Sequence, residues 1–87
     1  MEKKYFQHWA ESVLGEGIIL LEATGDEITR QVEIYGDSVI WCDSSGQSDD
    51  RFMLADQPVS AIGLDTEHEI PASDFEAAWR KARVVNQ

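Results

Sequence analysis

The 87-residue chain carries 17 acidic and 7 basic side chains, for a formal net charge of −10, and 43% of its residues are hydrophobic. This length predicts a single domain spanning residues 1–87, and the apolar content is enough for a globular core, which argues against wholesale disorder. Binding to nucleic acid or to an anionic membrane needs clustered basic side chains, so the negative charge disfavours both partners.

The sequence lacks the patterns of a membrane span, a signal peptide and a disulfide. Its longest apolar run, Ile18–Leu21, is far too short to cross a bilayer. The first nine residues contain no continuous apolar stretch of the kind that signal peptides carry. The single cysteine, Cys42, cannot form an internal disulfide. These features predict a cytoplasmic protein.

Four β-strands are predicted before residue 44. The first is Tyr5–Glu11, which pairs through the loop Ser12–Glu16 with the next strand. Three further strands form a central antiparallel meander: Gly17–Thr24, Glu27–Tyr35 and Ser38–Asp43. The middle one alternates polar and apolar residues, as half-buried strands do. A Gly-Asp pair precedes it and another follows it, which suits two-residue hairpin loops because glycine accepts positive φ without steric cost.

The segment after the meander carries weaker signals. Asp43–Arg51 is rich in Asp, Ser and Gly, which predicts an exposed acidic loop. We expect Arg51–Ala55 to form a short fifth strand, and Pro58–Leu64 to form a short strand or turn that returns the chain.

The C-terminal segment is the clearest helix. Ser73 and Glu76 have the spacing of a capping box, in which each side chain satisfies a free backbone donor. An apolar stripe then follows at helical spacing, made of Phe75, Ala78, Trp79 and Ala82. The predicted fold class is α+β: a small twisted antiparallel sheet, or partly open barrel, of four to five strands with a C-terminal amphipathic helix.

Two-residue loops fix a predicted register. Leu21 lies opposite Arg30 across the first turn, and Arg30 lies opposite Asp43 across the second, and directly opposed residues share a face. One face is therefore the expected core and carries Ile19, Leu21, Ala23, Ile28, Val32, Ile34, Val39 and Trp41.

The other sheet face is unusually apolar for a solvated surface. It carries Ile18, Leu20, Tyr35, Ile40 and Cys42. An exposed patch of this kind is typical of a partner or dimer surface, whereas a sheet that curls would cover it with the N-terminal strand or with residues 53–64. Together with the acidic loop, the expected interaction surface is Ile18, Leu20, Tyr35, Ile40, Asp43, Asp49 and Asp50.

Few side chains have the pattern of a reactive or metal site. Cys42 neighbours Asp43, which disfavours a thiolate, and we expect a half-buried, inert thiol. His8 and His68 have no third soft ligand, so we expect no zinc site. The loop that begins at Asp43 lacks the glycine and the final acidic residue of a calcium loop, with Ser48 and Leu54 in their places. We therefore expect no catalytic site, no metal and no cofactor.

Arg30 is the most suggestive single residue, because it lies on an otherwise apolar strand face. Its planar fork suits an anionic ligand. The competing interpretation is a structural ion pair with Asp43 across the strands, with Glu22 as a further partner only if the register differs.

The order of several short motifs resembles a family of small acidic bacterial domains of unknown function. The resemblance rests on Trp9, Glu22, the run Arg30–Asp37, Pro58, Ile70 and the run Phe75–Trp79. It spans most of the chain and implies a bacterial soluble protein, and it implies no activity. The family pattern has Asp-Gly at the second hairpin turn, where this chain has Gly36-Asp37.

Three functions compete. The first is a non-catalytic protein–protein interaction module, whose partner is a basic protein or a second copy of the chain. The second is an inhibitor or immunity-type protein that masks a basic, nuclease-like partner with its acidic residues. The third is a small-anion-binding domain that uses Arg30. The negative field favours encounter with a basic partner in the first two cases.

Overall fold

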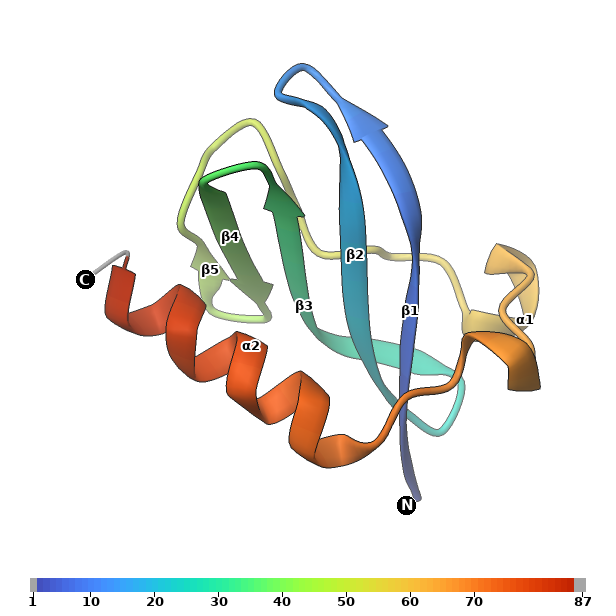
Figure 1. Ribbon diagram of the computed structural model, residues 1–87. Coiled ribbons are helices and arrows are strands. Elements are labelled where there is room, and N and C mark those ends of the chain that lie inside the picture. Colours follow the sequence, from blue (N-terminus) through green and yellow to red (C-terminus); the bar gives the residue numbers. More distant parts are fainter. Residues whose placement is uncertain (1, 86–87) are drawn as a thin grey trace.

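The computed structural model describes residues 2–85 and shows one antiparallel sheet with a long C-terminal helix (Figure 1). The strands lie in the order β1-β2-β3-β4-β5, which leaves β1 and β5 as the two edges. Their bounds are β1 Lys3–Ser12, β2 Gly15–Thr24, β3 Glu27–Tyr35, β4 Ser38–Asp43 and β5 Gly46–Gln47. The predicted α+β class and the central meander are confirmed.

The predicted fifth strand over 51–55 is wrong, because the chain reverses earlier. Asp43 accepts hydrogen bonds from the backbone N–H and the hydroxyl of Ser45, and this turn lets Gly46–Gln47 pair back onto β4. Arg51 instead belongs to a turn, and residues 52–55 then cross the sheet without forming a strand (Figure 1). There the Ala55 N–H donates to the side-chain oxygen of Gln31 at 3.0 Å.

The segment predicted as a strand or turn over 58–64 contains a short helix, α1 (Val59–Ile62). Pro58 precedes it with φ −66°, which is suited to a helix start, and Gly63 ends it in the left-handed region at φ 84°. A 3₁₀ helix at Thr66–His68 follows before the last helix.

Helix α2 (Ala72–Val85) packs its predicted apolar stripe on the sheet, with Phe75 and Ala82 fully buried. The predicted capping box is wrong, because the helix begins before Ser73. The carbonyl of Pro71 accepts from the N–H groups of Asp74 and Phe75. The Glu76 carboxylate accepts hydrogen bonds from Arg30 rather than from a backbone N–H at the start of the helix.

A β-bulge changes the predicted register between β2 and β3. Ala23 pairs with Ile28 as expected, but Glu22 pairs with Arg30, so Thr29 is an extra residue in β3. The predicted pairing of Leu21 with Arg30 is therefore wrong. The β3–β4 register is confirmed, including Arg30 opposite Asp43.

The bulge redistributes side chains between the two faces. The face under α2 carries a cluster formed by Leu20, Val32, Val39, Phe75 and Ala82, with Ile18, Ile34 and Trp41 packed against it. The predicted core residues Ile19, Leu21, Ala23 and Ile28 lie on the opposite face, where Phe6, Leu21, Ala23 and Ile28 form a second cluster. A third cluster there contains Tyr35, Ile40, Cys42 and Phe52.

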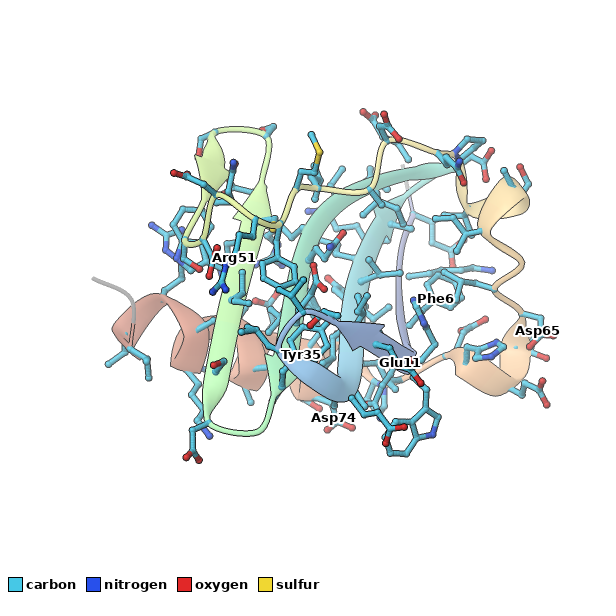
Figure 2. The ribbon with its side chains drawn as sticks, turned by 90° about the horizontal axis from the view of Figure 1, so that it is seen from above. Phe6, Glu11, Tyr35, Arg51, Asp65 and Asp74 are labelled. Carbon is cyan, nitrogen blue, oxygen red and sulfur yellow. The ribbon has the colours of Figure 1, made fainter. Side chains whose placement is uncertain are left out.

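The sheet face opposite α2 is covered by other parts of the chain. Of the two alternatives that the sequence left open, an exposed partner surface or a covered face, the structure has the covered face. Leu54, Val59, Ile62 and Leu64 pack on the Phe6 cluster, and Ala10 and Leu14 from the β1–β2 hairpin pack on the Tyr35 cluster. Figure 2 shows Phe6 between β1 and the segment that carries α1. Within residues 2–85, no helix is both long and apolar enough to cross a membrane.

Candidate functional site

Arg30 is held by two carboxylates on the α2 side of the sheet. Its Nε and Nη2 donate to the two oxygens of Glu22 at 2.9 and 2.5 Å. Its Nη1 and Nη2 donate to the two oxygens of Glu76 on α2 at 3.1 and 2.6 Å. The guanidinium also lies 5.0 Å from the ring centres of both Phe75 and Trp79. Arg30 therefore ties β2, β3 and α2 together.

Glu22 is a carboxylate only 1% exposed, and this cluster satisfies it. Besides Arg30, the hydroxyls of Thr29 and Tyr5 donate to it at 2.8 and 3.2 Å. Burial raises the pKa of Glu22, but the hydrogen bonds from Arg30 and Thr29 outweigh burial and hold that pKa below its usual value. The hydrogen bond from Arg30 also lowers the pKa of Glu76.

The predicted pair between Arg30 and Asp43 does not form, although the two residues are opposed in the sheet. The bulge brings Glu22 opposite Arg30, and the Asp43 carboxylate turns to Ser45 instead. The fork of Arg30 is already occupied by two anionic groups, which would also repel a bound anion. The structural interpretation of Arg30 is thus favoured over an anion site.

A second polar network lies on the opposite sheet face. The Glu33 carboxylate, 5% exposed, accepts from the Tyr35 hydroxyl at 2.5 Å and from Gln31 Nε2 at 2.7 Å. Gln31 also links this network to the covering segment through the Met53 carbonyl and the Ala55 N–H. Burial, together with the hydrogen bond to Glu33, raises the pKa of Tyr35 to about 12. The network fastens residues 53–55 to the sheet.

The thiol of Cys42 is fully buried. Burial, reinforced by the negative charges of Glu33 and Asp43, raises its pKa to about 12. A thiol with that pKa is almost entirely protonated near neutral pH, which is the unreactive state expected from the sequence.

The expected interaction surface does not assemble as predicted. Leu20, Tyr35 and Ile40 are 4%, 3% and 4% exposed, which corrects the prediction that they form an exposed face; the helix covers the first, and the chain after β5 covers the other two. Ile18 stays half-buried.

The acidic members of that expected surface lie in the loops after β4. Asp43 is engaged by Ser45, and Asp49 accepts three hydrogen bonds from the side chain and backbone N–H of Arg51, which lower the pKa of Asp49 to about 2. Asp50 is exposed. Two of the three predicted charges are therefore engaged by groups of the chain itself.

One small group of ligand-type atoms was not predicted. Asp65, Glu67 and His68 place one such atom each within 4.8 Å of the others. The Asp65 side chain accepts from the Glu67 N–H and lies 3.1 Å from the His68 ring nitrogen, so both side chains cap the 3₁₀ helix. These capping contacts explain why the side chains of Asp65 and His68 lie close together, and no metal is needed to explain it.

The largest exposed apolar side chain lies on the β1–β2 hairpin. Trp9 is 80% exposed, and nearby Val13, at the hairpin turn, is 79% exposed. Figure 1 shows this turn at the end of the sheet away from α2, and Figure 2 labels Glu11 near it. Helix α2 does not reach this end of the sheet, so it does not cover the indole.

Trp9 lies between two hollows of the surface, one lined by acidic side chains and the other by a mixture of polar and apolar side chains. With Ala10, Glu11 and Glu16, it lines an open hollow of about 440 Å³. A second hollow of about 440 Å³, beside Gln7, His8, Ile18 and His68, shares Trp9 as a wall. His8 and His68, sixty residues apart, thus line the same hollow.

Strand register explains which of these side chains share a face. Trp9 is paired with Ile18, and Glu11 is paired with Glu16, so these four and Gln7 point to the same side of the sheet. We call Gln7, Trp9, Glu11, Glu16 and Ile18 the Trp9 surface. Ile18 is its only member among the predicted site residues. The sequence contains no signal for the others, since alternation along β1 does not say which part a helix covers.

Comparison with protein-family models, with curated proteins and with solved structures finds no match.

Proposed function

We propose that this chain is a non-catalytic interaction module that binds a basic protein partner through the Trp9 surface. The observation that carries the proposal is an 80% exposed indole beside two carboxylates on one sheet face. Tryptophan combines a large apolar area with few rotatable bonds, and it is enriched among the residues that dominate binding energy in interfaces.

The electrostatics of the surface favour a cation. Glu11 and Glu16 are directly opposed across the two strands, and like charges in that position repel each other. A lysine or arginine from a partner relieves that repulsion, and the face of Trp9 attracts the same cation. The net charge of −10 further accelerates encounter with a basic protein.

The inhibitor hypothesis shares the basic partner but assigns its recognition to the acidic loop after β4, with Asp43, Asp49, Asp50 and Asp56, and to the run Asp65, Glu67 and Glu69. The engagement of Asp49 by Arg51 and of Asp43 by Ser45 supports the Trp9 surface over that loop. The bacterial origin and the cytoplasmic location expected from the sequence stay predictions.

Matched variants test the location of the binding surface. The full chain is immobilised, and capture from a bacterial lysate at low and high salt is compared between variants. Trp9→Ser is expected to reduce capture of a salt-sensitive basic protein by about tenfold or more, as loss of an interface anchor does. Met53→Ser is the control, because Met53 is 75% exposed on a different part of the molecule.

A second pair of variants tests the charges. Glu11→Lys combined with Glu16→Lys is expected to abolish capture, whereas Asp50→Lys in the acidic loop leaves it unchanged. The opposite pattern, in which only the Asp50 variant loses the partner, would support the inhibitor hypothesis and overturn the proposal. Equal capture by all variants would also overturn it.

A further inference from the structure

The outer edge of β1 already pairs with another segment of the chain at Phe6. Phe6 forms an antiparallel bridge with Glu69, and the Ile70 N–H donates to the Tyr5 carbonyl at 2.9 Å. Beyond this point the chain turns into the 3₁₀ helix at Thr66–His68, which lies beside β1 but forms no strand pairing with it. Within residues 2–85, no other segment pairs with the outer side of Trp9–Ser12.

Strand periodicity identifies the backbone groups that face outward there. In an antiparallel strand, the N–H and C=O of one residue point to the same side, and consecutive residues alternate. Because the Tyr5 carbonyl points away from β2, the groups of Trp9 and Glu11 do so too. The exposed ring nitrogen of His8 lies 2.9 Å from the Trp9 carbonyl, a surface contact that a partner N–H can replace.

We infer that the partner supplies an extended basic segment that adds to the sheet antiparallel to Trp9–Ser12. This inference rests on the proposed function and specifies its binding mode, which is strand addition at a sheet edge. The antiparallel direction continues the pairing that Glu69 begins. Partner residues opposite Trp9 and Glu11 share their face, so lysine or arginine at these positions meets the indole and the carboxylates of Glu11 and Glu16.

A second copy of the chain is a poorer occupant of this edge. Antiparallel pairing of two β1 strands centred on Glu11 would oppose the two copies of Glu11 directly, each already opposed by Glu16, and pairing centred on Ala10 would place the two copies diagonally on one face. Each copy would also bring a net charge of −10. The cost of opposed like charges therefore favours a basic segment over self-association.

The test uses the full chain and a defined probe, an acetylated and amidated nonapeptide in which threonine and lysine alternate. Binding is followed by the backbone amide signals of the ¹⁵N-labelled protein and by titration of the affinity. We expect signal shifts centred on Trp9–Ser12, loss of binding in Trp9→Ser, and retained binding in Met53→Ser. The same peptide with glutamine for lysine is expected not to bind.

N-methylated peptides then test the backbone pairing. In the antiparallel arrangement, the lysine amides face β1 and the threonine amides face away. Methylation of all lysine amides is therefore expected to weaken binding by about tenfold or more, since it removes donors and leaves acceptors unpaired. Methylation of the threonine amides is expected to change it little.

The outcomes separate this inference from the proposed function. Equal binding of both methylated peptides, or greater loss from methylated threonine amides, overturns antiparallel strand addition while the Trp9-dependent capture above still stands. Absence of binding by the lysine peptide, or concentration-dependent dimerisation through β1 in its place, also overturns it. If capture does not depend on Trp9, the proposed function itself fails.

Discussion

Glu22 shows at the residue scale how a carboxylate is accommodated at 1% exposure. A buried ion pair is a weak source of net stability, because both groups lose their hydration, but removal of one partner leaves the other charged and unpaired. Here the bulge at Thr29 supplies one donor and aligns Arg30 to supply two more. The pair with Glu22 therefore acts mainly to fix Arg30 between β2 and β3, from where the same guanidinium holds Glu76 of α2.

Replacement of Arg30 tests this role. We expect Arg30→Met to lower the free energy of unfolding by about 3 kcal/mol, because the buried Glu22 carboxylate keeps only the exposed Lys3 ammonium, 3.8 Å away, as a cation. The double variant with Glu22→Gln should recover part of that loss. Chemical denaturation measures both effects, and Arg51→Met is the control, since its pair with Asp49 is exposed and its loss should matter far less. Equal effects of the two arginine substitutions would contradict the structural role.

Strand β2 shows at the element scale how close backbone contact shapes the hairpin. A Cβ atom added to Gly17 would lie 1.9 Å from the Ile34 carbonyl oxygen and 2.6 Å from the Tyr35 ring. This approach allows Ala10 and Leu14 of the hairpin to reach the Tyr35 cluster. Glycine is thus required at this position by packing, although Gly17 is not among the glycines with a positive φ.

Substitution of this glycine should separate packing from backbone strain. Gly17→Ala is expected to destabilise the fold by about 2–3 kcal/mol, because the added methyl group must displace the backbone of β3. Gly15→Ala is the matched control: its φ of 103° is strained for alanine, but its Cβ meets nothing within 4 Å. We expect it to cost about 1 kcal/mol. Denaturant midpoints of the two variants measure the difference, and a larger loss in the Gly15 variant would contradict the packing argument.

At the scale of the whole molecule, ionisable groups that are buried or ion-paired on the two faces of the sheet should limit the pH range of stability. The pKa values of Glu22 and Glu76 are lowered in the folded state, so their stabilisation is present above the usual value of 4.5 and is lost as the pH falls through their folded pKa values. The pKa values of Tyr35 and Cys42 are raised to about 12. Their stabilisation is complete below 9 and is lost as the pH rises toward 12.

Denaturation measured across the pH range is expected to give a free energy of unfolding that is constant at intermediate pH and falls at both the acid and the alkaline end. Tyr35→Phe should make the alkaline limb shallower without moving the acid limb, because it removes one proton release on unfolding. Glu76→Gln should make the acid limb shallower and leave the alkaline limb in place. A change in the acid limb caused by Tyr35→Phe, or in the alkaline limb caused by Glu76→Gln, would contradict the assignment of these two groups.

The sequence by itself determined the elements whose causes are local. Period-two alternation identified β3, the Gly-Asp loops set the β3–β4 register, and the apolar stripe identified α2 and the side it buries. Each of these signals depends on residues within one hairpin or a few helical turns, so no distant contact is needed to interpret them.

Only the tertiary structure decided the rest. The bulge at Thr29 places Glu22 opposite Arg30, whose guanidinium also binds Glu76 of α2, and this one-residue change moved Ile18 and Leu20 to the helix side. The cover over Tyr35 and Ile40 comes from Phe52 and Leu54, more than ten positions later in the chain, and from Ala10 and Leu14 of the β1–β2 hairpin. Trp9 is exposed because α2 does not extend above the hairpin, and alternation along a strand cannot specify which of its faces another element reaches.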